Sequence, residues 1–314
     1  MRSIDAAAVH AALPYGKLIP HLKAAFQAGG EVPVRGHYHI DDPKGGPGGT
    51  LLIMPAWQPG KHVGIKMVSV YPDNPKAGLP SVIGAYMLFD ANTGAPKAVI
   101  DGVALTLRRT ACASALAADY LARKDAQHLL MIGAGSLAPH LVRAHCAVRR
   151  YKRIEIWNRN RSSAEALAAK LTDTGASVAV VDDLESAQRA ADTISCATLS
   201  REPLVRGDWL KPGTHVDLVG GFTPLMREAD DATLRRAAIW VDTRAGAMKE
   251  AGDLVDPLNR GVITADAVRG DLADLARNDA WCRPGDQPLT LFKSVGTALE
   301  DLAAAELVAA TVMA

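Results

Sequence analysis

The feature that most constrains this chain is a glycine pattern placed directly after a short apolar run. Residues 129–132, Leu-Leu-Met-Ile, are typical of a strand buried on both faces, and the residues after 138 have the composition of a helix. Gly133 would allow a tight turn, Gly135 would let the main chain approach a pyrophosphate, and the small Ala138 would let helix pack on strand. The sequence therefore predicts a dinucleotide-binding turn over residues 133–138.

A second predicted strand, residues 153–157, ends in the region where such a turn expects its ribose-reading residue. An acidic side chain there would accept a hydrogen bond from the ribose 2′-hydroxyl and repel a 2′-phosphate. This chain has Asn158, Arg159, Asn160 and Arg161 instead, which offer hydrogen-bond donors and positive charge. The segment favours NADPH, with NADH as a weaker possibility. The alternative is that the two arginines simply solvate the start of a helix.

The composition argues against several other classes of protein. With 314 residues, 48% of them hydrophobic, the chain is long enough to form two domains. Its net charge of +1, without a basic run interleaved with aromatic residues, predicts no nucleic-acid partner. The sequence shows no apolar stretch of membrane-spanning length and no signal peptide. We therefore expect no membrane partner and a cytoplasmic location.

Cysteine and histidine residues give no sign of a disulfide or a metal site. His37 and His39 would share one face of a strand, but no third ligand is in view, so no metal is predicted. The cysteines lack CxxC spacing and are expected to be reduced, with most of them buried as small apolar side chains. They are Cys112, Cys146, Cys196 and Cys282.

The N-terminal part reads as helices around a set of antiparallel strands. Residues 1 to about 30 are predicted helical with a break at residues 14–16, and a long helix is predicted from Leu105 to about Arg123. Between these helices the hydrophobic period changes to two, which indicates strands. The strands are predicted at residues 32–40, 50–55, 63–70, 81–90 and 97–101.

Three basic residues in this part invite a functional interpretation. Lys66 stands among apolar residues of a predicted strand, either as an edge lysine that discourages strand addition or as a desolvated ammonium that binds a carboxylate or moves a proton. Arg108 and Arg109 are predicted in a first helical turn, where arginine opposes the helix dipole unless an anion lies between them. The alternative is that one arginine points to water.

From residue 128 onward, strands and helices alternate, which predicts a doubly wound parallel α/β sheet, the Rossmann fold, over residues 126–289. Its ligand crevice lies at the carboxyl ends of the strands, so Thr198 and the pair Gly220-Gly221 are expected to face the cofactor. Residues 288–296 are expected to leave the sheet, so that residues 1–125 and 290–314 form a second, α+β domain. The sheet strands are predicted at 128–133, 153–158, 177–181, 192–198, 215–221 and 238–242.

With Lys66, Arg109-Thr110, the glycine turn and the segment Phe292-Lys293-Ser294-Val295-Gly296 in this order, the chain resembles the ornithine cyclodeaminase/μ-crystallin family. The likeness runs essentially end to end. It implies an NAD(P)-dependent enzyme that acts on small α-amino or α-imino acids. It also implies a homodimer, in which the N-terminal domain and the C-terminal helix build the substrate site and the subunit interface.

The resemblance assigns roles to individual residues. It implies that Arg35, Lys66 and Arg109 hold the substrate carboxylate, that Ser81 lines the pocket, and that Ser294 and Val295 reach it. Lys66 is the candidate catalytic residue, with carboxylate binding as its first role and proton supply as its second. The implied cofactor-binding residues are Arg109, Gly133, Ala134, Gly135, Ser136, Leu137, Asn158, Arg159, Asn160, Thr198, Val219 and Gly220.

One departure from the family pattern decides between its branches. Cyclodeaminases carry a proton-transferring aspartate just after a Gly-Gly turn, and this chain has Phe222 there. The resemblance therefore implies NADPH-dependent reduction of a cyclic ketimine acid, Δ1-pyrroline-2-carboxylate or Δ1-piperideine-2-carboxylate, to L-proline or L-pipecolate. The alternatives are an alanine-dehydrogenase-like or N-methylamino-acid-forming oxidoreductase and, with less support, an ornithine cyclodeaminase or a ligand-binding protein without turnover.

Overall fold

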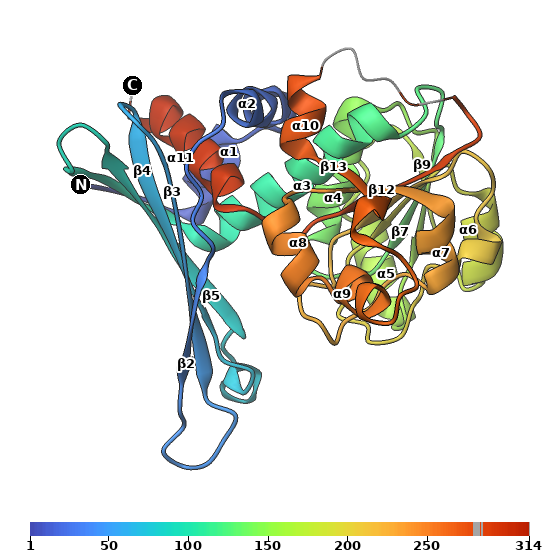
Figure 1. The fold of residues 1–314 in the computed structure, drawn as a ribbon, viewed down its shortest axis with the longest axis horizontal. Helices are drawn as coiled ribbons and strands as arrows, with labels where there is room; N and C mark the ends of the chain where they lie inside the picture. The colour runs from blue at the N-terminus through green and yellow to red at the C-terminus, as the bar shows by residue number, and fades with distance from the viewer. Residues whose placement is uncertain (279–282, 284, 314) are drawn as a thin grey trace. The chain divides into compact units, whose positions relative to one another are not determined.

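The computed structural model describes residues 1–278, 283 and 285–313, and it divides into two compact units (Figure 1). Unit 1 comprises Met1–Arg109 and Thr297–Ala314, and unit 2 comprises Thr110–Gly296. The expected boundaries after residues 125 and 289 are thus both displaced. The N-terminal boundary falls inside helix α3 (Gly102–Leu121), and the C-terminal boundary follows a strand that belongs to unit 2.

Unit 1 contains a six-stranded sheet. Its strands are β1 (Arg2–Ile4), β2 (Gly36–Ile40), β3 (Gly49–Gln58), β4 (His62–Val70), β5 (Val82–Asp90) and β6 (Pro96–Asp101). Their order across the sheet is β1-β6-β5-β4-β3-β2. β1 pairs parallel with β6, and the remaining neighbours pair antiparallel. The period-two alternation of the sequence therefore identifies the meander from β2 to β6 correctly.

Three helices of unit 1 lie on one face of this sheet (Figure 1). They are α1 (Ala6–Ala12), α2 (Tyr15–Ala28) and α11 (Ala298–Val312). The C-terminal helix α11 packs across β3, β4 and β5 and against α2. Leu22 of α2 and Leu302 and Val308 of α11 are buried in this layer. The sheet core of unit 1 is therefore closed by the last helix of the chain.

Two predictions for unit 1 are wrong in detail. Residues 1–30 are not entirely helical, because β1 precedes α1 and adds to the sheet beside β6. The helix predicted from Leu105 begins at Gly102 instead, because the Asp101 side chain accepts a hydrogen bond from the Ala104 amide (2.7 Å) and caps its first turn. Arg109 consequently lies beyond the first turn, and the helix-dipole argument for an anion there does not apply.

Unit 2 is organised around an eight-stranded sheet. Its strands are β7 (His128–Ile132), β8 (Arg153–Trp157), β9 (Ser177–Val180), β10 (Thr193–Cys196), β11 (His215–Leu218), β12 (Ala237–Val241), β13 (Val268–Asp271) and β14 (Leu289–Lys293). The order across the sheet is β13-β12-β14-β11-β10-β7-β8-β9, and all neighbouring pairs are parallel. The predicted doubly wound α/β fold is therefore confirmed.

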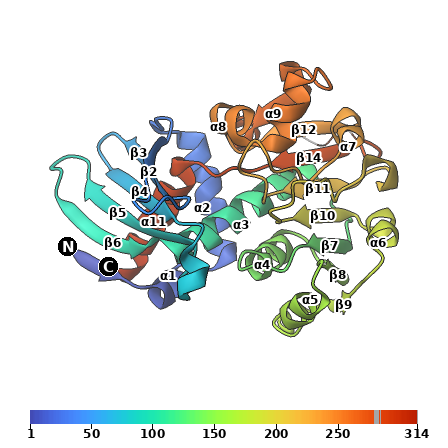
Figure 2. The same cartoon turned by 90° about the horizontal axis from the view of Figure 1, so that it is seen from below.

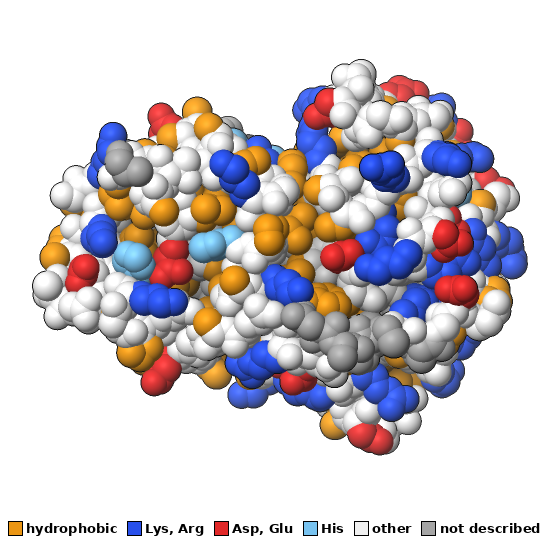
Figure 3. All heavy atoms as spheres, turned by 90° about the horizontal axis from the view of Figure 1, so that it is seen from above, with side chains coloured by type: hydrophobic (Ala, Val, Ile, Leu, Met, Phe, Trp, Pro, Cys, Tyr) orange, Lys and Arg blue, Asp and Glu red, His pale blue; other side chains and the backbone are white. Residues whose placement is uncertain are grey.

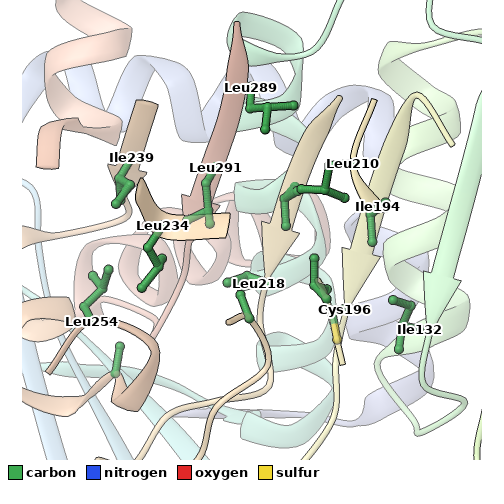
Figure 4. Close-up of a cluster of buried hydrophobic side chains, with 14 of the residues drawn as sticks. Ile132, Ile194, Cys196, Leu210, Leu218, Leu234, Ile239, Leu254, Leu289 and Leu291 are labelled. Carbon is green, nitrogen blue, oxygen red and sulfur yellow. The ribbon is translucent and has the colours of Figure 1, made fainter. Parts of the chain in front are cut away.

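Helices cover both faces of the parallel sheet, as Figure 2 shows with α4 and α5 on one face and α6 and α7 on the other. Figure 4 shows the apolar core between the sheet and the helices of the second face. In this core Ile194, Leu218 and Leu291, from three neighbouring strands, are fully buried. The helices of unit 2 that follow α3 are α4 (Ala138–Val148), α5 (Arg161–Ala168), α6 (Leu184–Ala190), α7 (Asp231–Arg236), α8 (Arg244–Glu250), α9 (Gly252–Asn259) and α10 (Leu272–Arg277).

The segment 288–296 does not leave the sheet as predicted. Its residues Leu289–Lys293 form β14, an inner strand between β11 and β12, and every residue of this strand is buried. The charge of Lys293 argues against a buried strand in the sequence, but this lysine has acidic neighbours in the structure, at Asp253 and Glu228. The edge strand β13 was not predicted either.

The surface carries charges of both signs. On the face that Figure 3 displays, Lys and Arg side chains are interspersed with acidic and apolar ones, in keeping with the net charge of +1. Among the described residues, no helix combines the length and the apolar character needed to cross a bilayer. The described cysteines Cys112, Cys146 and Cys196 are free thiols, and Cys282 lies outside the described residues.

Candidate active site

Lys66 occupies the middle of the sheet in unit 1. It lies on β4, where it pairs with Met54 of β3 on one side and Tyr86 of β5 on the other. All three side chains are buried, and Lys66 itself is only 2% exposed. The edge-lysine interpretation is therefore wrong, and the desolvated ammonium is the interpretation that the fold supports.

The charge of Lys66 is balanced by the first turn of α11. Lys66 Nζ lies 2.7 Å from Asp301 Oδ2. Arg109 of α3 reaches the same turn, because its Nε donates to Asp301 Oδ1 (2.9 Å) and its Nη1 donates to Glu300 Oε2 (2.7 Å). Both carboxylates are fully buried. We call these four side chains, Lys66, Arg109, Glu300 and Asp301, the buried ion cluster.

Glu300 and Asp301 are the functional residues that sequence reasoning missed. They stand at the start of an Ala- and Leu-rich helix, where acidic residues are expected simply because they favour the positive end of the helix dipole. The available signal was that the segment is apolar on nearly every side, so a helix there has no polar face on which the two acids could lie. Buried acids require partners, and the cations at positions 66 and 109 are those partners.

Burial shifts the pKa values in this cluster in opposite directions. Burial and the charge of Arg109 lower the pKa of Lys66 to about 8, although Asp301 acts the other way. Burial alone would raise the pKa of Asp301, but Arg109 and Lys66 outweigh it and hold that pKa below its ordinary value. The result is a lysine that carries a proton near neutral pH and can release it there.

The sheet register relates the other predicted substrate residues to Lys66. Gly36 pairs with Ile53, the neighbour of Met54, and Met54 pairs with Lys66, so Arg35, which directly precedes Gly36, lies near this part of the sheet. Its charge contributes to lowering the pKa of Lys66. Ser81 lies opposite Tyr71, which directly follows β4. Tyr71 comes five residues after Lys66, so Ser81 is roughly 17 Å from Lys66 at the rise of a strand. The structure brings Arg35 toward the buried ion cluster and does not bring Ser81 there.

The charges that gather here favour an anion. Arg35, Lys66 and Arg109 carry three positive charges, and Glu300 and Asp301 carry two negative ones. Four of these side chains are buried, and Arg35, which is half-buried, adds a third cation whose charge acts on Lys66. Such a set of cations can hold a carboxylate, and charge-assisted hydrogen bonds to a carboxylate contribute about 1.5–3 kcal/mol each.

The predicted dinucleotide turn of unit 2 has the required backbone. Gly133 has φ +105°, and a Cβ there would lie 2.6 Å from the Ala197 carbonyl oxygen. A Cβ on Gly135 would meet nothing within 4 Å, so the space above this residue is open. No side chain caps the start of α4, where Leu137 is the N-cap residue. The open space and the uncapped helix start fit a pyrophosphate group.

The segment after β8 has one paired and one exposed arginine. Arg161 contacts the carboxylates of Glu165 and Asp182, so much of its charge is balanced within the protein. Asn160 caps α5 by accepting a hydrogen bond from the Ser162 amide (3.0 Å). Arg159 is exposed at the start of this turn. The predicted pair of 2′-phosphate ligands is thereby reduced to Arg159, and Arg161 fits the alternative of a solvated helix start.

The residues predicted after β14 are held by an aspartate that was not predicted. Asp242 follows β12 and is 1% exposed. Its Oδ2 accepts hydrogen bonds from Ser294 Oγ (3.1 Å), from the Val295 amide (2.7 Å) and from the Gly296 amide. Ser294 is itself buried, while Val295 is partly exposed. The backbone of this segment is therefore fixed from within unit 2.

The sequence matches the model of the ornithine cyclodeaminase/mu-crystallin family over residues 5–314. The chain belongs to this family. Among its relatives, Delta(1)-pyrroline-2-carboxylate reductase of Paracoccus denitrificans is 42% identical over 266 residues, which are 84% of this chain and 84% of that protein.

Two solved structures of related proteins share the fold. Delta(1)-pyrroline-2-carboxylate reductase of Thermococcus litoralis, in complex with NADH and L-proline, has a TM-score of 0.93 and 32% identity, and the comparison covers 100% of this chain and 98% of that chain. An archaeal alanine dehydrogenase dimer with bound NAD has a TM-score of 0.91 and 28% identity, covering 100% and 96%. The Rossmann architecture of unit 2 is thus shared with oxidoreductases that bind NAD(H).

Phe222 stands where the resemblance implies an aspartate in cyclodeaminases. Phe222 is 45% exposed in the loop that follows β11. Its side chain has no titratable group, so it cannot exchange protons with a substrate amine as an aspartate does. This observation is consistent with reductase relatives rather than with deamination.

Proposed function

We propose that the protein uses NADPH to reduce the C=N bond of a cyclic ketimine acid, Δ1-pyrroline-2-carboxylate or Δ1-piperideine-2-carboxylate, to L-proline or L-pipecolate. The single observation that carries this proposal is that two buried cations, Lys66 and Arg109, meet at one place in the fold and that the charge of Arg35 acts on the same lysine. Cations gathered in this way can hold the carboxylate of a small acid. Reductases of pyrroline-2-carboxylate among the relatives supply the reaction class.

Arg35 and Arg109 would fix the substrate carboxylate, and Ser294 and Val295 are proposed as further substrate contacts. Lys66 has two roles in this proposal. Its ammonium binds the carboxylate, and its Nζ proton, held with a pKa of about 8, is available to the ring nitrogen near neutral pH. When bound, the nicotinamide supplies the hydride that the imine carbon accepts.

Residues of unit 2 would hold the cofactor. The pyrophosphate would lie on the backbone of Gly133–Leu137, at the start of α4. The adenosine ribose would lie at Asn158–Asn160, where the missing carboxylate and the exposed Arg159 support NADPH over NADH. Thr198, Val219 and Gly220 stand at the carboxyl ends of β10 and β11, where a doubly wound fold binds its ligand. We also propose that Arg109 contributes to binding the cofactor phosphates.

We also propose a homodimer, because the sheet of unit 1 has a second apolar face. Strand alternation directs Ile65 and Met67 away from Lys66, and their face includes Ile53, Ile83 and Tyr38 by register. Tyr38 is 54% exposed and Ile83 is 44% exposed. No described helix of unit 1 covers this face (Figure 1). An identical face from a second copy would bury it.

The activity is tested by following NADPH consumption with the five- and six-membered ketimines side by side. We expect turnover with cyclic ketimines to exceed turnover with pyruvate plus ammonia or methylamine. Lys66→Ala should lower kcat/KM by about 10²–10⁴-fold, because proton transfer and part of the carboxylate binding are lost, and should leave the Kd for NADPH near its original value. Lys97→Ala, a change of a partly exposed lysine on β6, is the matched control. Ammonia release from ornithine would contradict the assignment.

The pKa of Lys66 predicts a pH dependence. For ketimine reduction, kcat/KM should fall as the pH rises through about 8, because the neutral amine neither attracts the carboxylate nor donates a proton. Asp301 raises the pKa of Lys66, so Asp301→Asn should move this basic limb to lower pH. Glu306→Gln changes another acid of α11, one that pairs with His62, and should leave the limb in place. Ionisation of the substrate is the same for all three proteins, so an unmoved limb in Asp301→Asn would refute the role of Lys66.

Cofactor preference is tested by a pair of arginine variants. Arg159→Ala should raise the KM for NADPH more than that for NADH, because an exposed guanidinium that faces a 2′-phosphate is lost. Arg161→Ala should change the two values alike, since Arg161 is paired with Glu165 and Asp182. Equal ratios of the two KM values in wild type and Arg159→Ala would remove the argument for NADPH.

The oligomeric state is tested by light scattering during size-exclusion chromatography. The native protein should have twice the mass of one chain. Tyr38→Glu combined with Ile83→Glu places two charges on the uncovered sheet face and should shift the equilibrium toward the monomer. Val103→Glu changes an apolar residue of comparable exposure on α3 and should leave the dimer intact. A native monomer would show that the face is not a subunit interface.

A further inference from the structure

A buried charge cluster in unit 2 is not used by the proposed chemistry. Lys293 of β14 has its Nζ 3.2 Å from Asp253 Oδ2 and 3.7 Å from Glu228 Oε2. Asp253 belongs to α9, and Glu228 belongs to the segment that leads from β11 to α7. All three side chains are fully buried. A buried cluster of this kind contributes little net stability, so its value has to be sought in what it positions.

Glu228 joins the loops that follow two neighbouring strands. Its Oε1 accepts hydrogen bonds from the amide (2.7 Å) and the Oγ1 (3.0 Å) of Thr198, which follows β10. Its Oε2 accepts from the amides of Gly220 (2.7 Å) and Gly221 (3.2 Å), which follow β11. Four donors on one buried carboxylate hold the ends of both strands at a fixed separation.

The same loops are packed too tightly for any side chain between them. A Cβ on Gly220 would lie 1.9 Å from the Thr198 carbonyl oxygen. A Cβ on Gly133 would lie 2.6 Å from the carbonyl oxygen of Ala197, the preceding residue. The dinucleotide turn, the loop after β10 and the loop after β11 therefore lie in direct contact, and Glu228 bridges the last two.

Glu228 is itself held in place by Asp253 and Lys293. Asp253 Oδ1 accepts hydrogen bonds from the backbone amides of Glu228 (2.6 Å) and Ala229 (3.0 Å). The ammonium of Lys293 lies between the two carboxylates. Glu228 therefore has little freedom to follow a loop that moves, and the loops are held to the sheet through it.

We propose that Glu228 is a positioning residue that fixes the loops after β10 and β11 as one rigid platform for the nicotinamide half of the cofactor. This inference rests on the proposed function in so far as these loops bind NADPH. The residue acts through Thr198, Gly220 and Gly221 and does not touch the reacting atoms. Misplacement of the cofactor by about 1 Å can lower a rate by roughly 10²-fold, so such a platform affects hydride transfer more than substrate affinity.

Glu228→Gln is the decisive variant. A carboxamide keeps the shape but turns one acceptor oxygen into a donor NH2, which must then face either the Thr198 amide or the two glycine amides. Without cofactor, amide hydrogen exchange at Thr198, Gly220 or Gly221 should rise by about tenfold or more, as expected for the loss of one charged hydrogen bond. With cofactor, the Kd for NADPH should rise, kcat should fall by about 10–100-fold, and the KM for the ketimine should change little.

Two further variants keep the test sharp. Asp217→Asn alters another fully buried carboxylate of the same sheet, on β11, where it binds His145 and Ser195, and exchange at the two loops should remain unchanged. Thr198→Val keeps the backbone amide but removes the hydroxyl, which donates to Glu228 and accepts from the Ser200 amide (3.4 Å), and it should give a milder increase in loop exchange if Glu228→Gln fails to fold. Unchanged loop exchange and NADPH affinity in Glu228→Gln would overturn the proposal. Loop exchange is measured without substrate or cofactor. Its outcome therefore tests the role of Glu228 independently of the reductase assignment.

Discussion

The structure of unit 1 depends on the pairing of two buried cations with acids from the far end of the chain. Transferring an ammonium or a guanidinium out of water costs several kcal/mol per ion unless a partner and hydrogen bonds offset it. Lys66 and Arg109 lie on a central strand and on α3, and neither is more than 5% exposed. Their partners Glu300 and Asp301 stand more than 190 residues after Arg109. The sheet can therefore bury these cations only when α11 has returned to it.

Unit 2 uses buried carboxylates in a comparable way, with backbone amides as the main partners. The side chain of Asp242 accepts hydrogen bonds from the backbone amides of residues 295 and 296. Glu228 accepts from the amides of residues 198, 220 and 221, and Asp253 accepts from those of residues 228 and 229. Loops at the carboxyl edge of a parallel sheet lack the ladder bonds that strands provide. Because a buried unpaired amide costs about 1–3 kcal/mol, a carboxylate that accepts two or more of them fixes a loop effectively. This accounts for three of the acids that are buried in a largely apolar unit.

The parts of the fold that could be predicted are those with a local signal. An uncharged apolar run identified β7, and the glycine spacing identified the turn after it. β1 has only three residues and gains its place by pairing with β6, nearly a hundred residues away, so no local pattern reveals it. β14 carries Lys293, and only the acids at positions 228 and 253 explain why a lysine is buried there. Local periodicity shows which face of a strand or helix is apolar, whereas the places of β1 and β14 depend on partners distant in sequence.

The residues of the candidate site differ in the same way, because some have a local signal in the sequence and others depend on distant partners. Lys66 stood out because it interrupts an apolar strand, but an edge position and a buried position give the same sequence pattern, and only the strand order separates them. Ser81 was carried over from a resemblance, and the register of β4 and β5 sets it far from Lys66. Glu300 and Asp301 looked like ordinary residues of a helix start. A sequence lists the charges that a site contains, but the balance among those charges is a property of the fold.

That balance constrains the chemistry. The set around Lys66 combines two buried cations that are paired with acids and a third cation, Arg35, whose charge acts on Lys66, and such a set can hold the single carboxylate of a ketimine acid. Reduction of C=N requires one hydride and one proton. A nicotinamide provides the first, and a lysine with a pKa of about 8 is suited to provide the second. Loss of ammonia with ring closure requires, in addition, a group that takes a proton from an amine and returns it. At the position where cyclodeaminases keep that group, this chain has the side chain of Phe222, so its requirements are met by reduction and not by deamination.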